Sequence, residues 1–188
     1  MAHGAARQMH WSEREYLQME DRSAIKHEYL DGEVFAMAGA KPEHNDIAAA
    51  LTVALGVMVR GRGCRAFNSD QRIHVPATGL YTYPDGGIKC GGGRIHADGM
   101  SLLDPVLLFE VLSESTRDYD RGAKLDHYKG IPTLRHVLLV DSAARHIEHH
   151  HRSAGGEWEL ATHLDGSIDL HDLGGLVALD EIYLTDAR

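Results

Sequence analysis

The chain has 188 residues, of which 43% are hydrophobic and 25% are charged, and it carries a net charge of −9. This length and composition are those of an ordinary globular protein with one domain over residues 1–188, and no apolar run approaches the roughly 20 residues that cross a bilayer, which excludes a membrane-spanning protein. The acidic balance counts against a general nucleic-acid binder, because such proteins usually present a basic surface.

The first half of the chain predicts two helices, a hairpin and three further strands. Ser12 stands three residues before Glu15, which is the capping-box spacing at the start of a helix. Asp31-Gly32 lies between two strand-like runs and indicates a tight β-hairpin. In chain order the expected elements are a helix over 12–19, hairpin strands over 26–30 and 33–37, a helix over 42–59, and strands over 64–68, 71–76 and 80–85.

The second half of the chain predicts a long loop, one helix and several strands. The run from Val106 to Leu112 is the most apolar in the chain, as expected of a central strand buried on both faces. The expected elements are a glycine-rich loop over 86–104, a strand over 106–112, a helix over 116–128, strands over 135–141, 145–152 and 157–163, and a weak C-terminal strand and turn. This order predicts an α/β (α+β) fold, with a mixed β-sheet flanked by helices and an N-terminal β-hairpin.

Two acidic residues lie at the polar ends of apolar, strand-like runs. Asp85 ends the run that begins at Leu80, and Glu110 interrupts the run 105–112. A carboxylate in so apolar a stretch is costly to desolvate, and a shared divalent cation would compensate both. Oxygen ligands favour Mg²⁺ or Mn²⁺ over softer metals. If the two strands are neighbours, their carboxylates can meet about 4 to 5 Å apart.

Lys124 is the third candidate, on the helix that follows the central strand. Asp120, Lys124 and Tyr128 stand four residues apart and share one helix face, so Lys124 can reach over the sheet to the carboxylates. An ammonium group beside them completes the minimum for metal-assisted phosphodiester hydrolysis. Taken singly, a turn acid such as Asp85 and a helix lysine are usually structural; Glu110, inside an apolar strand, favours function by itself.

Seven separated segments of the chain, in order, resemble the Uma2 family, formerly a domain of unknown function. The matching segments are Glu28–Glu33, Pro42–Asn45, Asn68–Ile73, Tyr83–Asp85, Phe109–Thr116, Tyr119–Tyr128 and Arg135–Asp141. That family belongs to the PD-(D/E)XK nuclease superfamily, which has the restriction-endonuclease-like fold. The resemblance covers about residues 12–185, and it implies a single nuclease-fold domain with that core.

The resemblance also implies roles for the candidate residues. Asp85 and Glu110 would hold Mg²⁺ (or Mn²⁺) together with the backbone carbonyl of Val111, and Lys124 would orient the attacking water or stabilise the transition state. The superfamily lysine is usually two residues after the second acid, and Leu112 occupies that position here. The resemblance therefore implies that the lysine has moved to position 124.

Two further features bear on this candidate site. Gly86-Gly87 and Lys89 stand where the family commonly has apolar β-branched residues, which predicts a weak or bulged strand. Glu28 and His44 are accessory candidates near the site. A purely structural role is an equal alternative for each, as an ion-pair partner for Glu28 and as a backbone-bonded residue at a helix start for His44.

The cysteines and the N-terminus bear on the location of the protein. The first residues lack the apolar centre of a secretory signal, so the expected location is the cytoplasm. Cys64 and Cys90 are not part of a CxxC pair, which argues against a zinc ribbon or a disulfide framework. The two could still meet in space, but buried free thiols are the prediction.

Two clusters of basic residues could suggest other sites. In the run 146–151, residues His146, Glu148 and His150 would share one face of a strand, but a solvated sheet edge is favoured over a metal site. This histidine tract could still bind Ni²⁺ or Zn²⁺ adventitiously. Four arginines could form a basic patch, although a solubilising role is favoured: Arg60, Arg62, Arg65 and Arg72.

The leading hypothesis is a Mg²⁺-dependent endonuclease that hydrolyses DNA. Its expected partner is DNA, without a membrane, and a homodimer is plausible because nucleases that cut both strands often pair two sites. The alternative is a catalytically silent nuclease-fold module that binds nucleic acid or protein. A cupin-like metal oxidoreductase, suggested by the strands and 14 histidines, lacks the required spacing of ligands.

Overall fold

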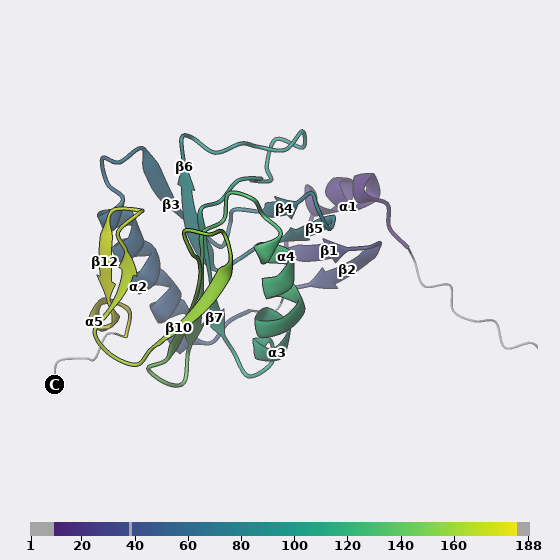
Figure 1. Cartoon of the computed structure of the whole chain (residues 1–188). Helices are drawn as coiled ribbons and strands as arrows, with labels where there is room; N and C mark the ends of the chain where they lie inside the picture. Colours follow the sequence, from purple (N-terminus) through teal and green to yellow (C-terminus); the bar gives the residue numbers. More distant parts are fainter. Residues whose placement is uncertain (1–9, 38, 184–188) are drawn as a thin grey trace, which may run out of the picture.

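The computed structural model describes residues 10–37 and 39–183 of the chain (Figure 1). The helices are α1 (Glu13–Glu20), α2 (Pro42–Met58), α3 (Arg117–Tyr119), the π-helical turn η1 (Asp120–Lys124), α4 (Leu125–Lys129) and α5 (Leu179–Ile182). The strands are β1 (His27–Leu30), β2 (Glu33–Ala36), β3 (Cys64–Asn68), β4 (Ile73–Val75), β5 (Leu80–Thr82), β6 (Gly86–Cys90), β7 (Leu107–Leu112), β8 (His136–Asp141), β9 (Ile147–Arg152), β10 (Trp158–His163), β11 (Ser167–Leu170) and β12 (Gly175–Ala178). Within these ranges, no helix combines the length and the apolar character needed to cross a membrane.

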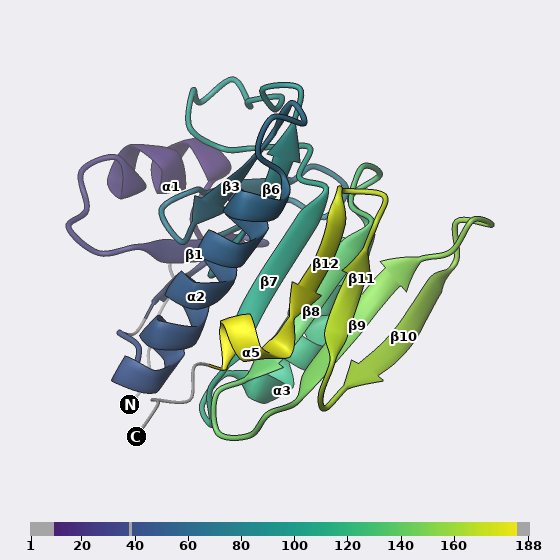
Figure 2. The same cartoon turned by 90° about the vertical axis from the view of Figure 1, so that its left-hand side faces the viewer.

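A six-stranded sheet with the order β10-β9-β8-β7-β6-β3 forms the centre of the molecule. Its β7 and β8 are parallel and its other pairs are antiparallel, so the sheet is mixed as predicted. Helix α2, α5 and the β11–β12 hairpin cover one face, and α3–α4 cover the other (Figures 1 and 2). The parallel pair excludes the cupin-like alternative, whose double-sheet architecture is antiparallel.

Strand β7 is the buried centre of this sheet, and its alternation separates two cores. Phe109 and Val111 pack toward α2, whereas Leu108 and Leu112 pack toward α4. Successive side chains of a strand point to opposite faces. Glu110 therefore points to the α4 side, among otherwise apolar neighbours, as the alternation predicts.

The N-terminal part forms a second sheet with the order β2-β1-β5-β4. The predicted capping box is present, because the Glu15 N–H donates to Ser12 Oγ at 3.3 Å and the Ser12 N–H donates to Glu15 Oε2 at 2.9 Å. The predicted hairpin turn is also present, with φ of 47° at Asp31 and 83° at Gly32, which is the left-handed backbone that Asp-Gly supplies in such turns. Helix α1, the β1–β2 hairpin and β5 lie together beside the large sheet (Figure 1).

The prediction of a loop from residue 86 is wrong, because Gly86–Cys90 is the inner strand β6, paired with β3 and β7. A Cβ on Gly86 would lie 2.5 Å from the Phe109 ring, and one on Gly87 would lie 2.3 Å from the Leu107 carbonyl oxygen. These glycines therefore allow close packing against β7. The pairing with β7 runs in continuous register, so the expected bulge is absent from it.

The prediction of free thiols is also wrong. Cys64 and Cys90 are direct cross-strand partners on β3 and β6 and form a disulfide. The pairing of the two cysteines could not be predicted, because residues 86–90 resemble a loop in the sequence. Reducing compartments keep most thiols reduced, so the oxidation state of this pair in cells tests the expected cytoplasmic location.

Two expectations about basic residues need correction. The histidine tract lies on β9, between β8 and β10, so it is not a solvated edge. His149 is only 3% exposed, and its Nε2 lies 2.9 Å from His136 Nδ1. Arg72 is 4% exposed and pairs with Asp98 at 3.1 Å, so it is not part of a surface patch.

Candidate active site

The carboxylate of Glu110 is held inside the fold by two donors. Glu110 is 4% exposed, the Tyr128 hydroxyl donates to its Oε1 at 2.5 Å, and the Lys124 ammonium lies 2.9 Å from the same oxygen. Both donors come from the helical segment that covers this face of β7. The predicted helix face, with Lys124 and Tyr128 together, thus converges on Glu110.

Asp85 lies where the chain passes from the small sheet to the large one. It follows β5 and directly precedes β6, and the pairing of Gly86 with Phe109 brings it beside the middle of β7. The Val111 N–H donates to Asp85 Oδ2 at 2.7 Å. The two predicted acids are therefore neighbours across the β6–β7 pair.

Lys124 lies in an acidic cluster, which is formed by the carboxylates of Glu28, Asp85, Glu110 and Asp120. Its Nζ lies 2.9 Å from Glu110 Oε1, 3.2 Å from Glu28 Oε1 and 3.7 Å from Asp120 Oδ1. Burial opposes the charged ammonium, but the carboxylates, Glu110 foremost, raise the pKa of Lys124 well above its usual range. The surrounding carboxylates therefore favour the charged form of this buried lysine.

A distortion of the helix places this lysine. The predicted continuous helix over 116–128 is broken into α3, η1 and α4, with non-helical backbone at Gly122 (φ −101°, ψ −108°). Such π-type turns inside helices are frequent at functional sites. Asp120 and Lys124 are the two buried residues of this turn, and both face the acidic cluster.

The two accessory candidates also reach the cluster. Glu28 on β1 accepts a hydrogen bond from the Thr82 hydroxyl and pairs with Lys124. His44, in the first turn of α2, lies with its Nε2 3.2 Å from Asp85 Oδ2. The hydrogen bond to Asp85 raises the pKa of His44, and the Val111 backbone adds to this effect. Among the described residues, the buried Nδ1 of His44 has no hydrogen-bond partner.

Negative charge is in excess at this cluster. Burial raises the pKa of Glu110 to about 8, with Asp85 and Asp120 adding to the rise and Lys124 opposing it. Burial likewise raises the pKa of Asp120. One ammonium group therefore does not balance the carboxylates gathered here, and the arrangement favours an additional cation.

A model of the Uma2 family, described as "putative restriction endonuclease", matches residues 14–179. The chain belongs to the Uma2 family. It is similar to two proteins of Synechocystis sp. (strain ATCC 27184 / PCC 6803 / Kazusa). The uncharacterized protein slr1290 is 36% identical over 173 residues, which is 92% of this chain and 90% of that protein. The uncharacterized protein sll1609 is 32% identical over 153 residues, which is 81% of this chain and 86% of that protein.

A solved structure supports the fold of this Uma2 chain. It is a "putative nuclease belonging to DUF820" from Anabaena variabilis ATCC 29413, with a TM-score of 0.71 and 16% identity, and the match covers 90% of this chain and 96% of that one. At this level of identity the likeness shows the fold alone. The predicted mixed sheet, flanked by helices and preceded by a hairpin, is thus confirmed.

Three residues that make contacts in the acidic cluster of this Uma2 protein were not assigned from the sequence. Asp120 and Tyr128 share the helix face of Lys124, but their bonds to it and to Glu110 depend on how the helix packs. The spacing of four residues was the available signal. Thr82, which donates to Glu28, had no signal, because its partner is 54 residues away in the chain.

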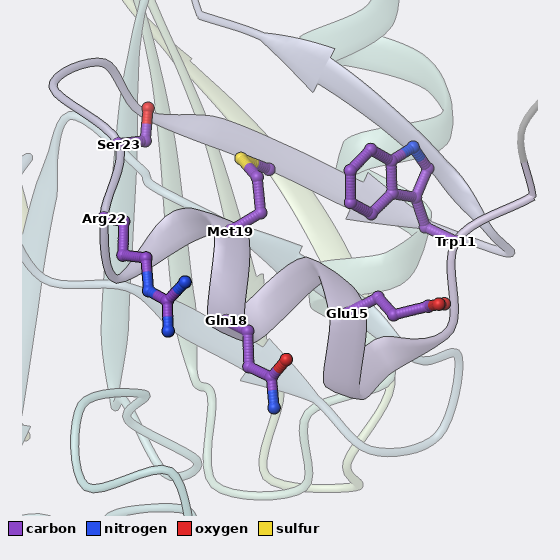
Figure 3. Close-up of a pocket in the computed structure, with 6 residues that line it drawn as sticks. All are labelled: Trp11, Glu15, Gln18, Met19, Arg22 and Ser23. Carbon is purple, nitrogen blue, oxygen red and sulfur yellow. The ribbon is translucent and has the colours of Figure 1, made fainter.

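A separate hollow of about 510 Å³ lies on the outer side of α1 (Figure 3). Its lining residues are Trp11, Glu15, Gln18, Met19, Arg22 and Ser23. None of the predicted site residues lines it.

Proposed function

We propose that this chain is a divalent-metal-dependent endonuclease that hydrolyses DNA phosphodiester bonds at Asp85, Glu110 and Lys124. The observation that carries the proposal is the convergence of the half-buried Asp85, the buried Glu110 and the buried Lys124. The Lys124 ammonium contacts Glu110, and Asp85 is bonded to the next residue of the same strand. Membership of a family described as "putative restriction endonuclease" supports the reaction class.

The residues present fit Mg²⁺ or Mn²⁺. The donors are carboxylate oxygens, which these ions prefer. Burial, with Asp85 and Asp120 adding to it, raises the pKa of Glu110, and a bound cation would favour its carboxylate form. His44 bonds Asp85 through its Nε2, and its buried Nδ1 has no hydrogen-bond partner among the described residues, so one polar group beside the site is left unsatisfied. Asp85, Glu110 and the Val111 carbonyl would hold the ion, with His44 as an accessory group.

A metal bound there would polarise the scissile phosphate and lower the pKa of a bound water. Lys124 would donate to the attacking water or to a phosphate oxygen, where its positive charge would stabilise the transition state. Glu28 and Asp120 hold the Lys124 ammonium in place, and Tyr128 orients Glu110. His44, bonded to Asp85, would hold that carboxylate at the strand end.

DNA is the proposed substrate, and a local basic surface supports it despite the overall acidity. Arg60, Arg62 and Arg65 are exposed, and Arg65 is the cross-strand partner of Lys89. Along β6, Lys89 lies four residues beyond Asp85, about 13 Å away. Phosphates flanking the scissile bond could therefore meet these cations. A homodimer would let two such sites cut both strands, and sedimentation would report it.

The test is cleavage of supercoiled and single-stranded DNA with Mg²⁺ or Mn²⁺. Asp85→Asn, Glu110→Gln and Lys124→Met should each lose at least about a hundredfold in rate, a loss typical of removing a catalytic group. Asp126→Asn and Lys129→Ala, from the same helical segment, are the matched controls and should cut like wild type. Equal cutting by all variants would indicate a contaminant. DNA binding without metal-dependent cutting would favour the silent binding module.

A further inference from the structure

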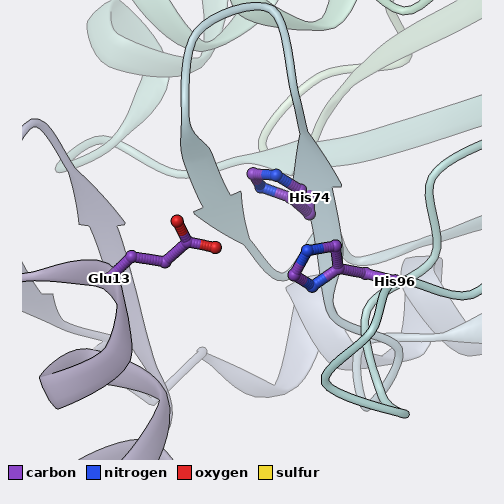
Figure 4. A group of neighbouring side chains, drawn as sticks. All are labelled: Glu13, His74 and His96. Atoms are coloured by element: carbon purple, nitrogen blue, oxygen red, sulfur yellow. The ribbon is translucent and has the colours of Figure 1, made fainter.

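Three side chains from distant parts of the sequence meet on the face of the small sheet that α1 covers. Glu13 lies in the first turn of α1, His74 in β4 and His96 in the loop after β6. One ligand atom from each lies within 4.8 Å of the other two. Figure 4 shows the Glu13 carboxylate pointing toward the two imidazole rings. We propose that Glu13, His74 and His96 form a second metal site, which binds Zn²⁺ or a similar transition-metal ion.

Neighbouring groups already orient two of these ligands. His74 Nδ1 lies 3.2 Å from the Leu80 carbonyl oxygen, and since a carbonyl only accepts, this nitrogen carries the proton and Nε2 is left to bind a metal. The Tyr81 hydroxyl donates to Glu13 Oε1 at 2.5 Å. Metal-binding histidines and carboxylates are commonly fixed by such outer hydrogen bonds.

The third ligand sits on a loop that is fastened to the same strand. The His96 N–H donates to the Ser101 carbonyl at 2.8 Å, and the His74 N–H donates to the Leu102 carbonyl at 3.1 Å. His96 Nδ1 also lies 3.5 Å from Asp98 Oδ2. The loop thus holds the His96 ring beside β4.

Two imidazoles and one carboxylate select the kind of ion. This donor set suits Zn²⁺ and related ions, with a water in the fourth position, whereas Mg²⁺ prefers oxygen ligands alone. With Zn–N and Zn–O bonds of about 2.0–2.1 Å, tetrahedral ligand atoms stand about 3.4 Å apart. The ligand atoms are at most 4.8 Å apart, so the group must contract by up to about 1.4 Å, which the exposed Glu13 side chain and the His96 loop can provide.

This group is separate from the acidic cluster. His74 is the register partner of Tyr81, so both point to the α1 face of the small sheet. The next residue, Thr82, points to the opposite face, where its hydroxyl bonds Glu28. A bound ion would therefore join α1, β4 and the 91–104 loop without entering the Asp85 and Glu110 site.

Calorimetric titration of the metal-free full-length chain with Zn²⁺, in excess Mg²⁺, tests the proposal. Wild type should bind one equivalent at this group, and Glu13→Gln and His96→Ala should each weaken that binding at least tenfold. Glu13→Gln keeps an acceptor for Tyr81, so the fold is preserved. Co²⁺ in place of Zn²⁺ should give a visible absorption band in wild type that both variants lose.

Three controls locate the ion. His171→Ala removes an exposed histidine from the turn between β11 and β12, and it should bind Zn²⁺ like wild type. This hairpin and α1 lie on opposite sides of the molecule (Figure 1). Asp85→Asn should also bind Zn²⁺ normally. The pair His149→Ala/His151→Ala tests the histidine tract and should leave the affinity unchanged. Wild-type affinity in either Glu13→Gln or His96→Ala, or loss of binding in the tract variant, would overturn the proposal.

Discussion

Lys124 Nζ lies between Glu110 Oε1, at 2.9 Å, and Glu28 Oε1, at 3.2 Å. One buried ammonium group thereby joins the central strand of the large sheet to the hairpin strand of the small sheet. The broken helix at Gly122 supplies the lysine from a third direction. The acidic cluster is therefore also a junction of the fold, and its catalytic and structural contributions can be separated by experiment.

Replacing Lys124 with Met is expected to lower the free energy of unfolding by about 3–5 kcal/mol, because Glu110 and Glu28 would remain buried without their cation. Urea unfolding at pH 7 measures this change. Lys129→Met, on the adjoining helix turn, should stay within about 0.5 kcal/mol of wild type. Adding Glu110→Gln to Lys124→Met should recover part of the loss, and no recovery would mean that the pair is not coupled.

Much of the fold could be predicted from local patterns. The capping box at Ser12, the Asp31-Gly32 turn and the apolar run of β7 each depend on neighbouring residues, and each is present. Strand β6 could not be predicted, because Gly86 and Gly87 are typical of loops in isolation. Glycine is needed at these two positions because of tertiary packing, since a side chain there would collide with β7.

Gly87→Ala tests that explanation. The added Cβ would lie 2.3 Å from the Leu107 carbonyl oxygen, which is backbone and cannot swing aside. We expect a loss of about 1–3 kcal/mol in the free energy of unfolding, as for other overpacked core positions. Gly155→Ala is the matched control, because its nearest neighbour atom is 3.7 Å away. Equal stability of the two variants in urea would argue against close packing at β6.

The six residues expected at the site, counting Val111 for its carbonyl, are brought together by the structure, although only some of them could be recognised from local sequence. Asp85 and Glu110 could be picked out because each is an acid in an apolar run. The π-type turn that carries Lys124 left no pattern beyond Gly122 itself. Contacts such as Thr82 to Glu28 depend on the pairing of distant strands, which one sequence does not reveal.

Acid should destabilise the protein through His149. Burial, with nearby imidazoles adding to it, lowers the pKa of His149 to about 3, against about 6.5 in an unfolded chain. As the pH falls from about 6.5 to about 3, the unfolded chain takes up a proton that the folded chain excludes, so stability declines. The decline in unfolding free energy from pH 7 to pH 5 should be smaller in His149→Gln. The exposed His171→Gln should keep the wild-type slope, and identical slopes in all three proteins would contradict the prediction.

The disulfide between Cys64 and Cys90 should stabilise the β3–β6 pair. It spans 26 residues, and a loop of this size corresponds to about 3.5 kcal/mol of lost entropy in the unfolded chain. Cys64→Ala/Cys90→Ala should lose about this much stability in urea unfolding. A reductant should lower the stability of wild type but not that of the double variant. Alkylation of thiols in intact cells would report the state in the native compartment. Two freely reactive thiols in air-oxidised protein would show that the bond does not form.

Metal binding at the acidic cluster is the measurement that tests the central claim most directly. Mn²⁺ titration of the His96→Ala chain removes any contribution from the Glu13, His74 and His96 group. One bound Mn²⁺ is expected, with at least tenfold weaker binding after Asp85→Asn or Glu110→Gln and unchanged binding after Asp126→Asn. The same Mn²⁺ affinity in all of these chains, or none in any, would contradict a metal centre held by Asp85 and Glu110.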